Sequence, residues 1–201
     1  MSLANYNDLK TAIADWTGRS DLGTTNYSNF TTLFETYANR NLRVRQMELQ
    51  TTLTPVSGEA TLPSDYLQWR RVTWEGSPSV ELAYVHPTMF LGYYPTTAQG
   101  TPTCFTIEGS TLKARPVSGT NLTLDYFQKI PSLETNSTNW LMTAHPDFYL
   151  SGVLTEAYFF TKDPDQAAVF MGRRNQLCDE ITRLNNASKA PGAIRVFGIT
   201  P

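Results

Sequence analysis

The side chains best able to do chemistry in this sequence are two histidines and two cysteines. His86 and His145 each precede a proline, and neither shares a motif with cysteines or a group of carboxylates. Cys104 and Cys178 lie far apart and lack the spacing of a metal site or a disulfide framework. Phosphate-binding, dinucleotide-binding and serine-hydrolase motifs are missing from the sequence. We therefore expect a protein without enzymatic activity, metal or cofactor.

Two acidic motifs are explained better by helix geometry than by catalysis. Residues 145–147, His-Pro-Asp, resemble the tripeptide of chaperone J-domains, but a Thr/Asn-rich linker precedes them instead of a basic helix. A proline at the first helical position and an aspartate in the first turn are typical of a helix start. Asp163 and Asp165 could act as a carboxylate pair, yet Asp163 directly before Pro164 is the expected cap of a further helix.

Three arginines, Arg40, Arg43 and Arg45, form a short basic cluster. We expect them on a helix whose apolar stripe runs from Phe30 to Val44. At 100° per residue, Arg40 and Arg43 fall on one flank of that stripe and Arg45 on the opposite flank. The cluster therefore does not form one basic face, which argues against a helix that reads a nucleic-acid groove. It favours a structural helix that binds a protein partner through arginine–carboxylate pairs.

Composition excludes several classes of function. Charged residues make up 17% of the 201 residues, against roughly 25% in an average protein. The net charge of -2 is spread evenly along the chain, whereas nucleic-acid binders usually concentrate positive charge. No apolar run approaches the ~20 residues that span a bilayer, so we expect no membrane partner. The cysteine usage and an N-terminus unlike a signal peptide suggest a reduced compartment.

The elements that position these residues follow the order helix, strand, helix. Apolar residues at helical spacing predict a helix over residues 6–16, capped by Asn5 or Asn7 and ended by Gly18. About seven short strands are expected next, and then two long helices. The predicted fold class is α+β: a helical bundle of two N-terminal and two C-terminal helices with an inserted antiparallel β-rich domain. The expected domains are a helical body, a β-rich insertion and an extended tail, which span residues 1–49 with 139–190, residues 50–138 and residues 191–201.

The β-rich insertion leaves two alternative functions open. Six aromatic residues could form a stacking platform for a carbohydrate-binding or host-recognition module, although such residues more often form a core: Trp69, Trp74, Tyr84, Phe90, Tyr93 and Tyr94. A weak nucleic-acid binder would instead use Arg70, Arg71 and Lys113.

The last residues form an apolar, β-prone segment after Pro191 and Gly192. A free tail is usually polar, so this segment is expected either to fold back on its own helices or to bind a partner in extended form. We favour partner binding, through Ile194, Arg195, Val196 and Phe197.

Six segments occur in an order with a known parallel: YNDLKTAIADWTGRSDL, FETYANRNLRVRQME, LPSDYLQWRRVTW, FTIEGSTLKARP, LTLDYFQKIP and NWLMTAHPDFYLSGVLTEAYFFTKDPDQAAVF. Their order resembles that of the head-to-tail adaptor (connector) proteins of short-tailed bacteriophages. The resemblance covers residues 5–185 and rests on order and spacing, since no segment is a catalytic signature.

The resemblance implies a structural virion protein at the head–tail junction, assembled in the cytoplasm of a host bacterium. Such proteins form a ring of about 12 copies beneath the portal protein, and the ring carries a tail nozzle or tail tube protein. DNA passes through the channel without specific binding. The resemblance also implies that the arginine cluster pairs with carboxylates of a neighbouring copy or of the portal.

Overall fold

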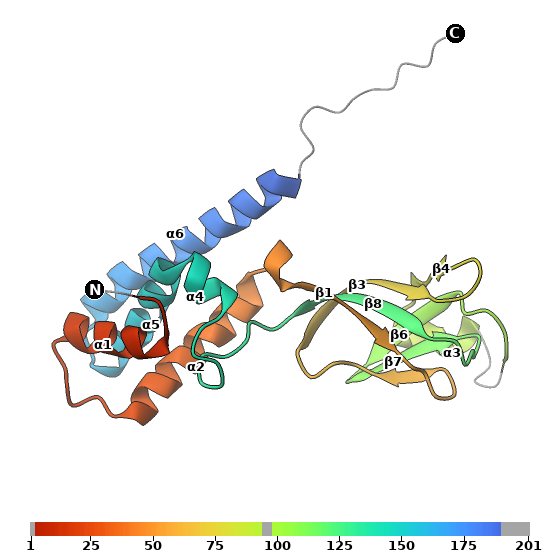
Figure 1. Cartoon of the computed structure of the whole chain (residues 1–201), viewed down its shortest axis with the longest axis horizontal. Helices are drawn as coiled ribbons and strands as arrows, with labels where there is room; N and C mark the ends of the chain where they lie inside the picture. The colour runs from red at the N-terminus through yellow and green to blue at the C-terminus, as the bar shows by residue number, and fades with distance from the viewer. Residues whose placement is uncertain (1–2, 94–97, 190–201) are drawn as a thin grey trace, which may run out of the picture. The chain divides into compact units, whose positions relative to one another are not determined.

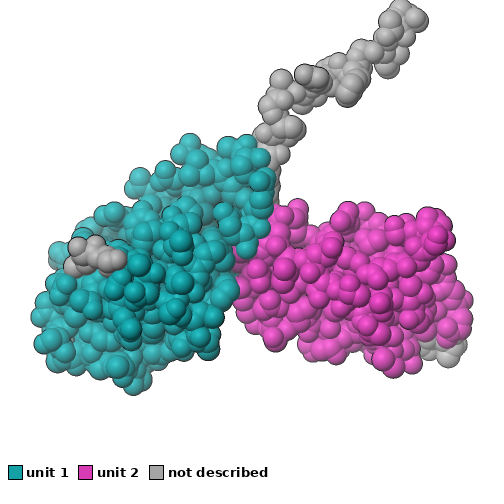
Figure 2. Space-filling model, in the orientation of Figure 1, with its two compact units in different colours: residues 1–46, 130–201 teal, residues 47–129 magenta. Residues whose placement is uncertain are grey.

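The structure is a computed structural model that describes residues 3–93 and 98–189, and its α+β fold class confirms the prediction (Figure 1). Two compact units divide the chain (Figure 2): residues 1–46 with 130–201, called the helical unit, and residues 47–129, called the β unit. The division into the domains expected from the sequence stays a prediction. No helix within the described residues is long and apolar enough to cross a membrane.

The helical unit contains five of the six α-helices that the described residues form. These are α1 (Tyr6–Thr17), α2 (Thr24–Asn41), α4 (Trp140–Ala144), α5 (Pro146–Phe160) and α6 (Pro164–Lys189). The ends of α1 are those expected: the Asn5 side chain accepts from the N–H groups of Asn7 and Asp8, and Gly18 ends the helix with a φ of 62°. Asp163 likewise accepts from the Gln166 N–H at the start of α6.

Helix α5 forms the centre of the helical unit and packs against α1, α2, α4 and α6. Its sequence is apolar around most of its circumference, and Phe148, Tyr149, Val153 and Leu154 are fully buried. Gly152 allows α2 to approach closely, because a Cβ atom there would overlap the ring of Phe34. The expectation of a central buried helix is therefore confirmed.

Helix α2 is shorter than expected. It ends at Asn41, and Leu42 has extended backbone angles. Val44 therefore lies outside the helix, and a short 3₁₀ turn, η1 (Arg45–Met47), follows. The expected apolar stripe is also wrong at Leu33, whose side chain is 53% exposed. The apolar pattern predicted a helix end that is too late, because Leu42 and Val44 are buried although they lie in the extended segment after α2.

The β unit holds two four-stranded sheets and the short helix α3 (Pro87–Tyr93). The first sheet has the order β1-β8-β3-β4, from β1 (Glu48–Leu53), β8 (Leu122–Gln128), β3 (Tyr66–Trp74) and β4 (Val80–Glu81). The second has the order β2-β7-β6-β5, from β2 (Glu59–Thr61), β7 (Thr111–Arg115), β6 (Cys104–Glu108) and β5 (Ala83–Tyr84). The core of the unit includes Val72, Phe105, Leu112 and Leu124.

The pairing in the β unit corrects one detail of the sequence interpretation. The expected hairpin is present as β6 and β7, and Gly109 at its turn has a φ of 59°. However, β5 pairs with β6 in parallel, so the insertion is not purely antiparallel. Two-residue strands such as β5 carry too few side chains for their direction to be read from alternation.

Candidate protein-interaction surfaces

The three clustered arginines have different surroundings in the structure. Arg40 lies on the exposed side of the last turn of α2 and has no hydrogen bond or ion pair within residues 3–93 and 98–189. Arg43 lies beyond the end of α2, and its Nη1 donates to the carbonyls of Asn39 and Leu42 at 2.7 and 2.6 Å. The expected placement of Arg43 beside Arg40 on one helical flank is therefore wrong. Arg43 satisfies carbonyl groups at the helix end, a role for which a cation suits the helix dipole.

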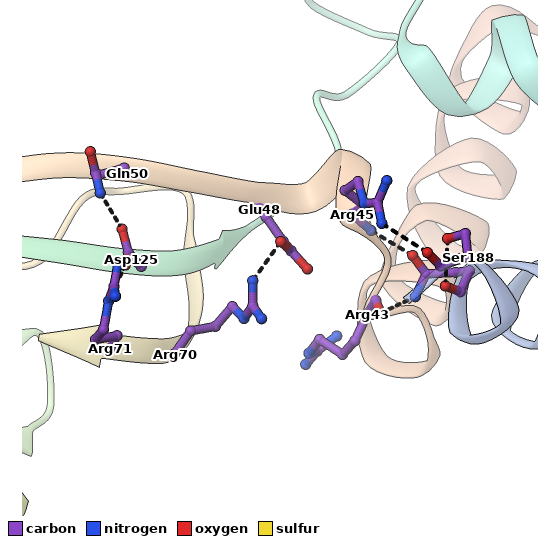
Figure 3. A network of polar contacts seen from close by, with 9 residues as sticks. Arg43, Arg45, Glu48, Gln50, Arg70, Arg71, Asp125 and Ser188 are labelled. Carbon is purple, nitrogen blue, oxygen red and sulfur yellow. Dashed lines mark hydrogen bonds and ion pairs between the residues drawn. The ribbon is translucent and has the colours of Figure 1, made fainter. Parts of the chain in front are cut away.

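Arg45 connects the segment after α2 to the end of α6 (Figure 3). Its backbone N–H donates to Oδ1 of Asn185 at 2.9 Å, and its Nη2 donates to the Ser188 carbonyl at 3.4 Å. The Asn185 amide also donates to the Arg43 carbonyl at 3.4 Å. One asparagine side chain thus binds the backbone on both sides of Val44. Arg43 and Arg45 therefore make contacts within the subunit, and their partner-binding role stays a prediction.

The contacts between α2 and α6 show that the two helices run in the same direction. Tyr37, one turn before Arg40, donates from its hydroxyl to Asn175 at 2.9 Å. Beyond the end of α2 and further along α6, Arg45 reaches Asn185 and Ser188. Arg174, only 8% exposed, lies 3.9 Å from the centre of the Tyr37 ring and pairs with Glu156 of α5 at 3.4 Å. The three helices are thus joined by a cation with little access to solvent.

Several helices of the same unit carry exposed apolar side chains. Among them are Leu33 on α2 and, on α6, Val169, Met171 and Leu184, of which Val169 is 65% exposed. Val169 borders a shallow hollow on the surface of α6, lined by Ala168, Val169, Gly172, Arg173, Gln176 and Leu177. Exposed apolar groups beside a hollow are typical of surfaces that contact another protein.

Three cations of the β unit, Arg70, Arg71 and Lys113, are paired with carboxylates, the first two shown in Figure 3. Arg70 pairs with Glu48, and Arg71 Nη2 lies 2.7 Å from Asp125. Lys113 similarly lies 2.7 Å from Glu108 at the end of the β6–β7 hairpin. A phosphate-binding surface needs cations that are free to neutralise phosphates. The three cations of the nucleic-acid alternative are already neutralised, so the geometry does not favour that alternative.

The aromatic residues of the β unit pack mainly on one another. Trp69 stacks on Tyr84 with 5.3 Å between ring centres, and Phe105 meets both rings edge-on. Phe90 is buried, and Trp74 donates to Ser118 at 3.2 Å. Tyr84, 42% exposed, remains accessible, while Tyr94 and the side chain of Tyr93 lie outside the described part of the structure. These contacts indicate that the aromatic residues mainly form the core of the β unit, and they do not favour an exposed platform for sugar rings.

A buried polar network in the helical unit escaped the sequence interpretation. The Glu35 carboxylate accepts from the Leu133 N–H at 2.9 Å and from the Tyr149 hydroxyl at 3.1 Å. That hydroxyl also accepts from the Asn139 amide at 2.7 Å. Burial raises the pKa of Glu35, and the Leu133 hydrogen bond opposes the rise. The signal in the sequence was the position of Glu35 next to Phe34, on the stripe that α2 buries.

The histidines and cysteines have structural surroundings. Nδ1 of His86 lies 2.9 Å from the Thr88 hydroxyl, and His145 precedes the first residue of α5. Cys104 and Cys178 are buried, and burial raises the pKa of both thiols. Among the described residues, no three His, Cys, Asp or Glu side chains form a group that could hold a metal ion. Helix geometry also explains Asp163, which caps α6.

The tail residues Ile194, Arg195, Val196 and Phe197 lie outside the described residues, so their partner-binding role stays a prediction.

A protein-family model matches most of the chain. No curated protein matches the chain. The family model described as SU10 adaptor protein matches residues 4–196, which include all the described helices and strands. The chain therefore belongs to the SU10 adaptor protein family, and the resemblance to phage adaptor proteins is confirmed.

Proposed function

We propose that this protein is the head-to-tail adaptor of a bacteriophage. In this proposal, about 12 copies form a ring beneath the portal protein, and the ring holds the tail nozzle or tail tube protein. The observation that carries the proposal is the family match over residues 4–196. Membership of an adaptor family implies a structural protein of the virion without catalytic activity.

The electrostatics of the chain support a channel that lets DNA pass. A duplex slides through a channel only if the wall makes few strong phosphate contacts. The net charge is -2, and Arg70, Arg71 and Lys113 are paired with carboxylates. A wall made of such a chain would not hold DNA, so translocation and ejection could proceed.

Partner contacts in this proposal come from the arginine cluster and from the tail. Arg40 is the member of the cluster with an exposed side chain and no partner among the described residues, so we assign it the contact with a neighbouring copy or the portal. Arg43 and Arg45 contribute by fixing the backbone beside that contact. Residues 194–197 of the tail bind a partner in extended form, with alternate side chains in pockets and main-chain hydrogen bonds to a sheet edge.

Electron microscopy of the purified chain mixed with its cognate portal protein tests the proposal. We expect portal rings that carry an added ring on one face, with an open central channel. Portal rings that stay bare at saturating amounts of the chain would contradict it. Binding to a glycan array, without portal binding, would favour the carbohydrate-recognition alternative.

A further inference from the structure

Helix α2 presents an exposed face to which the described residues of its own subunit offer no partner. Leu33, Thr36 and Arg40 lie three and four positions apart, so they share one side of the helix, and all three are exposed. The Leu33 side chain is 53% exposed. Within residues 3–93 and 98–189, Arg40 has no carboxylate partner. This face therefore offers an apolar side chain and, two turns later, a free cation.

The outer face of α6 carries complementary features in the same order along the helix. It begins with Val169 and the hollow at Gly172, which Arg173 also lines, and continues through Gln176 to the exposed carboxylates of Asp179 and Glu180, beyond which the exposed Arg183 follows. These residues face away from the buried side of α6, which carries Ala167, Phe170, Arg174, Cys178 and Ile181. Apolar surface is thus followed by acidic groups, where α2 has apolar surface followed by a cation.

Packing within the described part of the chain does not require a glycine at position 172. A Cβ atom at this position would meet no heavy atom within 4 Å, and its backbone is helical. Glycine is among the poorest helix formers, so alanine would suit an isolated subunit better. A glycine in an exposed helix is explained if another chain approaches the backbone closely at this point.

The spacing of the two faces matches. Leu33 and Arg40 are seven positions apart, as are Gly172 and Asp179. Seven residues span about 10.5 Å of helix, so both pairs align when the helices run in parallel. Within one subunit α2 and α6 do run in the same direction, as the Tyr37–Asn175 and Arg45–Asn185 contacts show. Neighbouring copies in a large ring differ by a small rotation, so α2 of one copy can lie parallel to α6 of the next.

We propose that neighbouring copies of this chain join through α2 of one copy and α6 of the next, with Leu33 in the hollow at Gly172 and Arg40 paired with Asp179 and Glu180. The contact uses two different faces, as a ring requires. The inference rests on the proposed ring and names the surfaces that form it.

A charge exchange tests the pairing most directly. Arg40→Glu should weaken assembly about tenfold or more, since it places like charges across the contact. Asp179→Lys with Glu180→Lys should do the same. The variant that combines all three substitutions should recover assembly, because the side chains that face each other across the contact again carry opposite charges. Lys162→Glu, a reversal of an exposed charge outside both faces, serves as the control and should assemble normally.

Gly172→Ala separates assembly from folding. The substitution should raise the melting temperature of the monomer by about 2–4 °C, because alanine is the better helix former. It should nevertheless weaken assembly, since the added methyl group fills the hollow that receives Leu33. Gly172→Leu should weaken assembly further. Normal assembly of Gly172→Leu would overturn the inference.

Assembly is measured by light scattering of the full chain, alone and with portal protein. If the wild type assembles and the charge-exchanged variant does not recover, the assigned pairing is wrong although the ring itself stands. If the wild type stays monomeric even with portal protein, both the ring and this contact are wrong. Recovery of the exchanged variant, with loss in each half-exchanged variant, is the result that the pairing predicts.

Discussion

Glu35 joins three separate segments of the helical unit through its side chain. It accepts hydrogen bonds from Leu133 and Tyr149 and is 6% exposed. Glu35→Ala should lower the free energy of unfolding by about 1–3 kcal/mol, because a buried N–H and a buried hydroxyl lose their acceptor. Urea unfolding measures the loss, and Glu134→Ala, at an exposed position, is the control. Equal stability of the two variants would contradict the role of Glu35.

The charge of Glu35 should make stability depend on pH. Burial raises its pKa above the ordinary value of 4.5, so the folded protein holds the proton more tightly than the unfolded chain does. The contribution of this group to stability is therefore full below about pH 4.5 and is lost as the pH rises through the raised pKa. Glu35→Gln keeps an oxygen acceptor and cannot ionise.

The stability of Glu35→Gln relative to wild type should therefore increase between about pH 4.5 and pH 7. Other titrating groups are common to both proteins and cancel in this comparison. Urea unfolding at a series of pH values measures the difference. A difference that stays constant over this range would mean that Glu35 ionises as readily in the folded protein as in the unfolded chain.

Arg40 and Arg43 should respond differently to substitution, although only two residues separate them. Arg43→Ala should lower the free energy of unfolding by about 1 kcal/mol, because two carbonyls at the end of α2 lose a charged donor. Arg40→Ala should change it by less than about 0.5 kcal/mol, as is usual at exposed positions. Thermal unfolding of the two monomeric variants measures this contrast. A larger loss of stability in Arg40→Ala than in Arg43→Ala would refute it.

At the scale of elements, two glycines in helices make a matched pair. Gly152→Ala should destabilise the protein by about 1–3 kcal/mol, because the new methyl group overlaps the Phe34 ring where α5 meets α2. Gly172→Ala on the open face of α6 should stabilise the monomer by about 1 kcal/mol. Chemical denaturation of the two variants tests both signs. Stabilisation by Gly152→Ala would show that α2 and α5 are not in close contact.

The ends and types of most helices could be predicted because local chemistry determines them. Asn5 and Gly18 bound α1, and the apolar circumference of α5 indicates a buried helix. The end of α2 could not be predicted, because Leu42 and Val44 keep an apolar pattern after the helix has stopped. The parallel pairing of β5 depends on a long-range contact with Cys104 and Phe105 that leaves no local signal.

The candidate site was predictable only in part, for the same reason. The arginine cluster was visible in the sequence, but the contacts that distinguish its members involve Asn185 and Ser188, about 140 positions away. The network around Glu35 likewise joins residues about 100 positions apart. The salt bridges that neutralise Arg70 and Arg71 depend on strand register, which composition does not contain.

At the scale of the whole molecule, the C-terminal tail is proposed to act by binding a partner in the assembled protein. Deletion of residues 191–201 should leave the melting temperature of the monomer unchanged and abolish stable attachment to the portal or to a neighbouring copy. Protease should remove the tail readily from the monomer and slowly from the assembled ring. Resistance of the tail in the isolated monomer would instead show that it packs on its own subunit.

The order of the segments, and not any single motif, indicated the function of the whole chain. Positive charge is not concentrated in any one segment and no apolar run is long enough to span a membrane, but these features fit many structural proteins. The family match over residues 4–196 shows that the chain belongs to the adaptor family that it resembles. Ring formation and portal binding follow from that membership as proposals, so they need a measurement on the assembled protein.

Native mass measurement of the purified chain, alone and with the cognate portal protein, tests the central claim most directly. A single chain has a mass of 22.5 kDa. With the portal present, we expect one complex whose added mass is a fixed multiple of the chain, about 12 copies for a ring that matches the portal. A chain that remains at the monomer mass in both samples, with no portal complex at any ratio, would contradict the adaptor function.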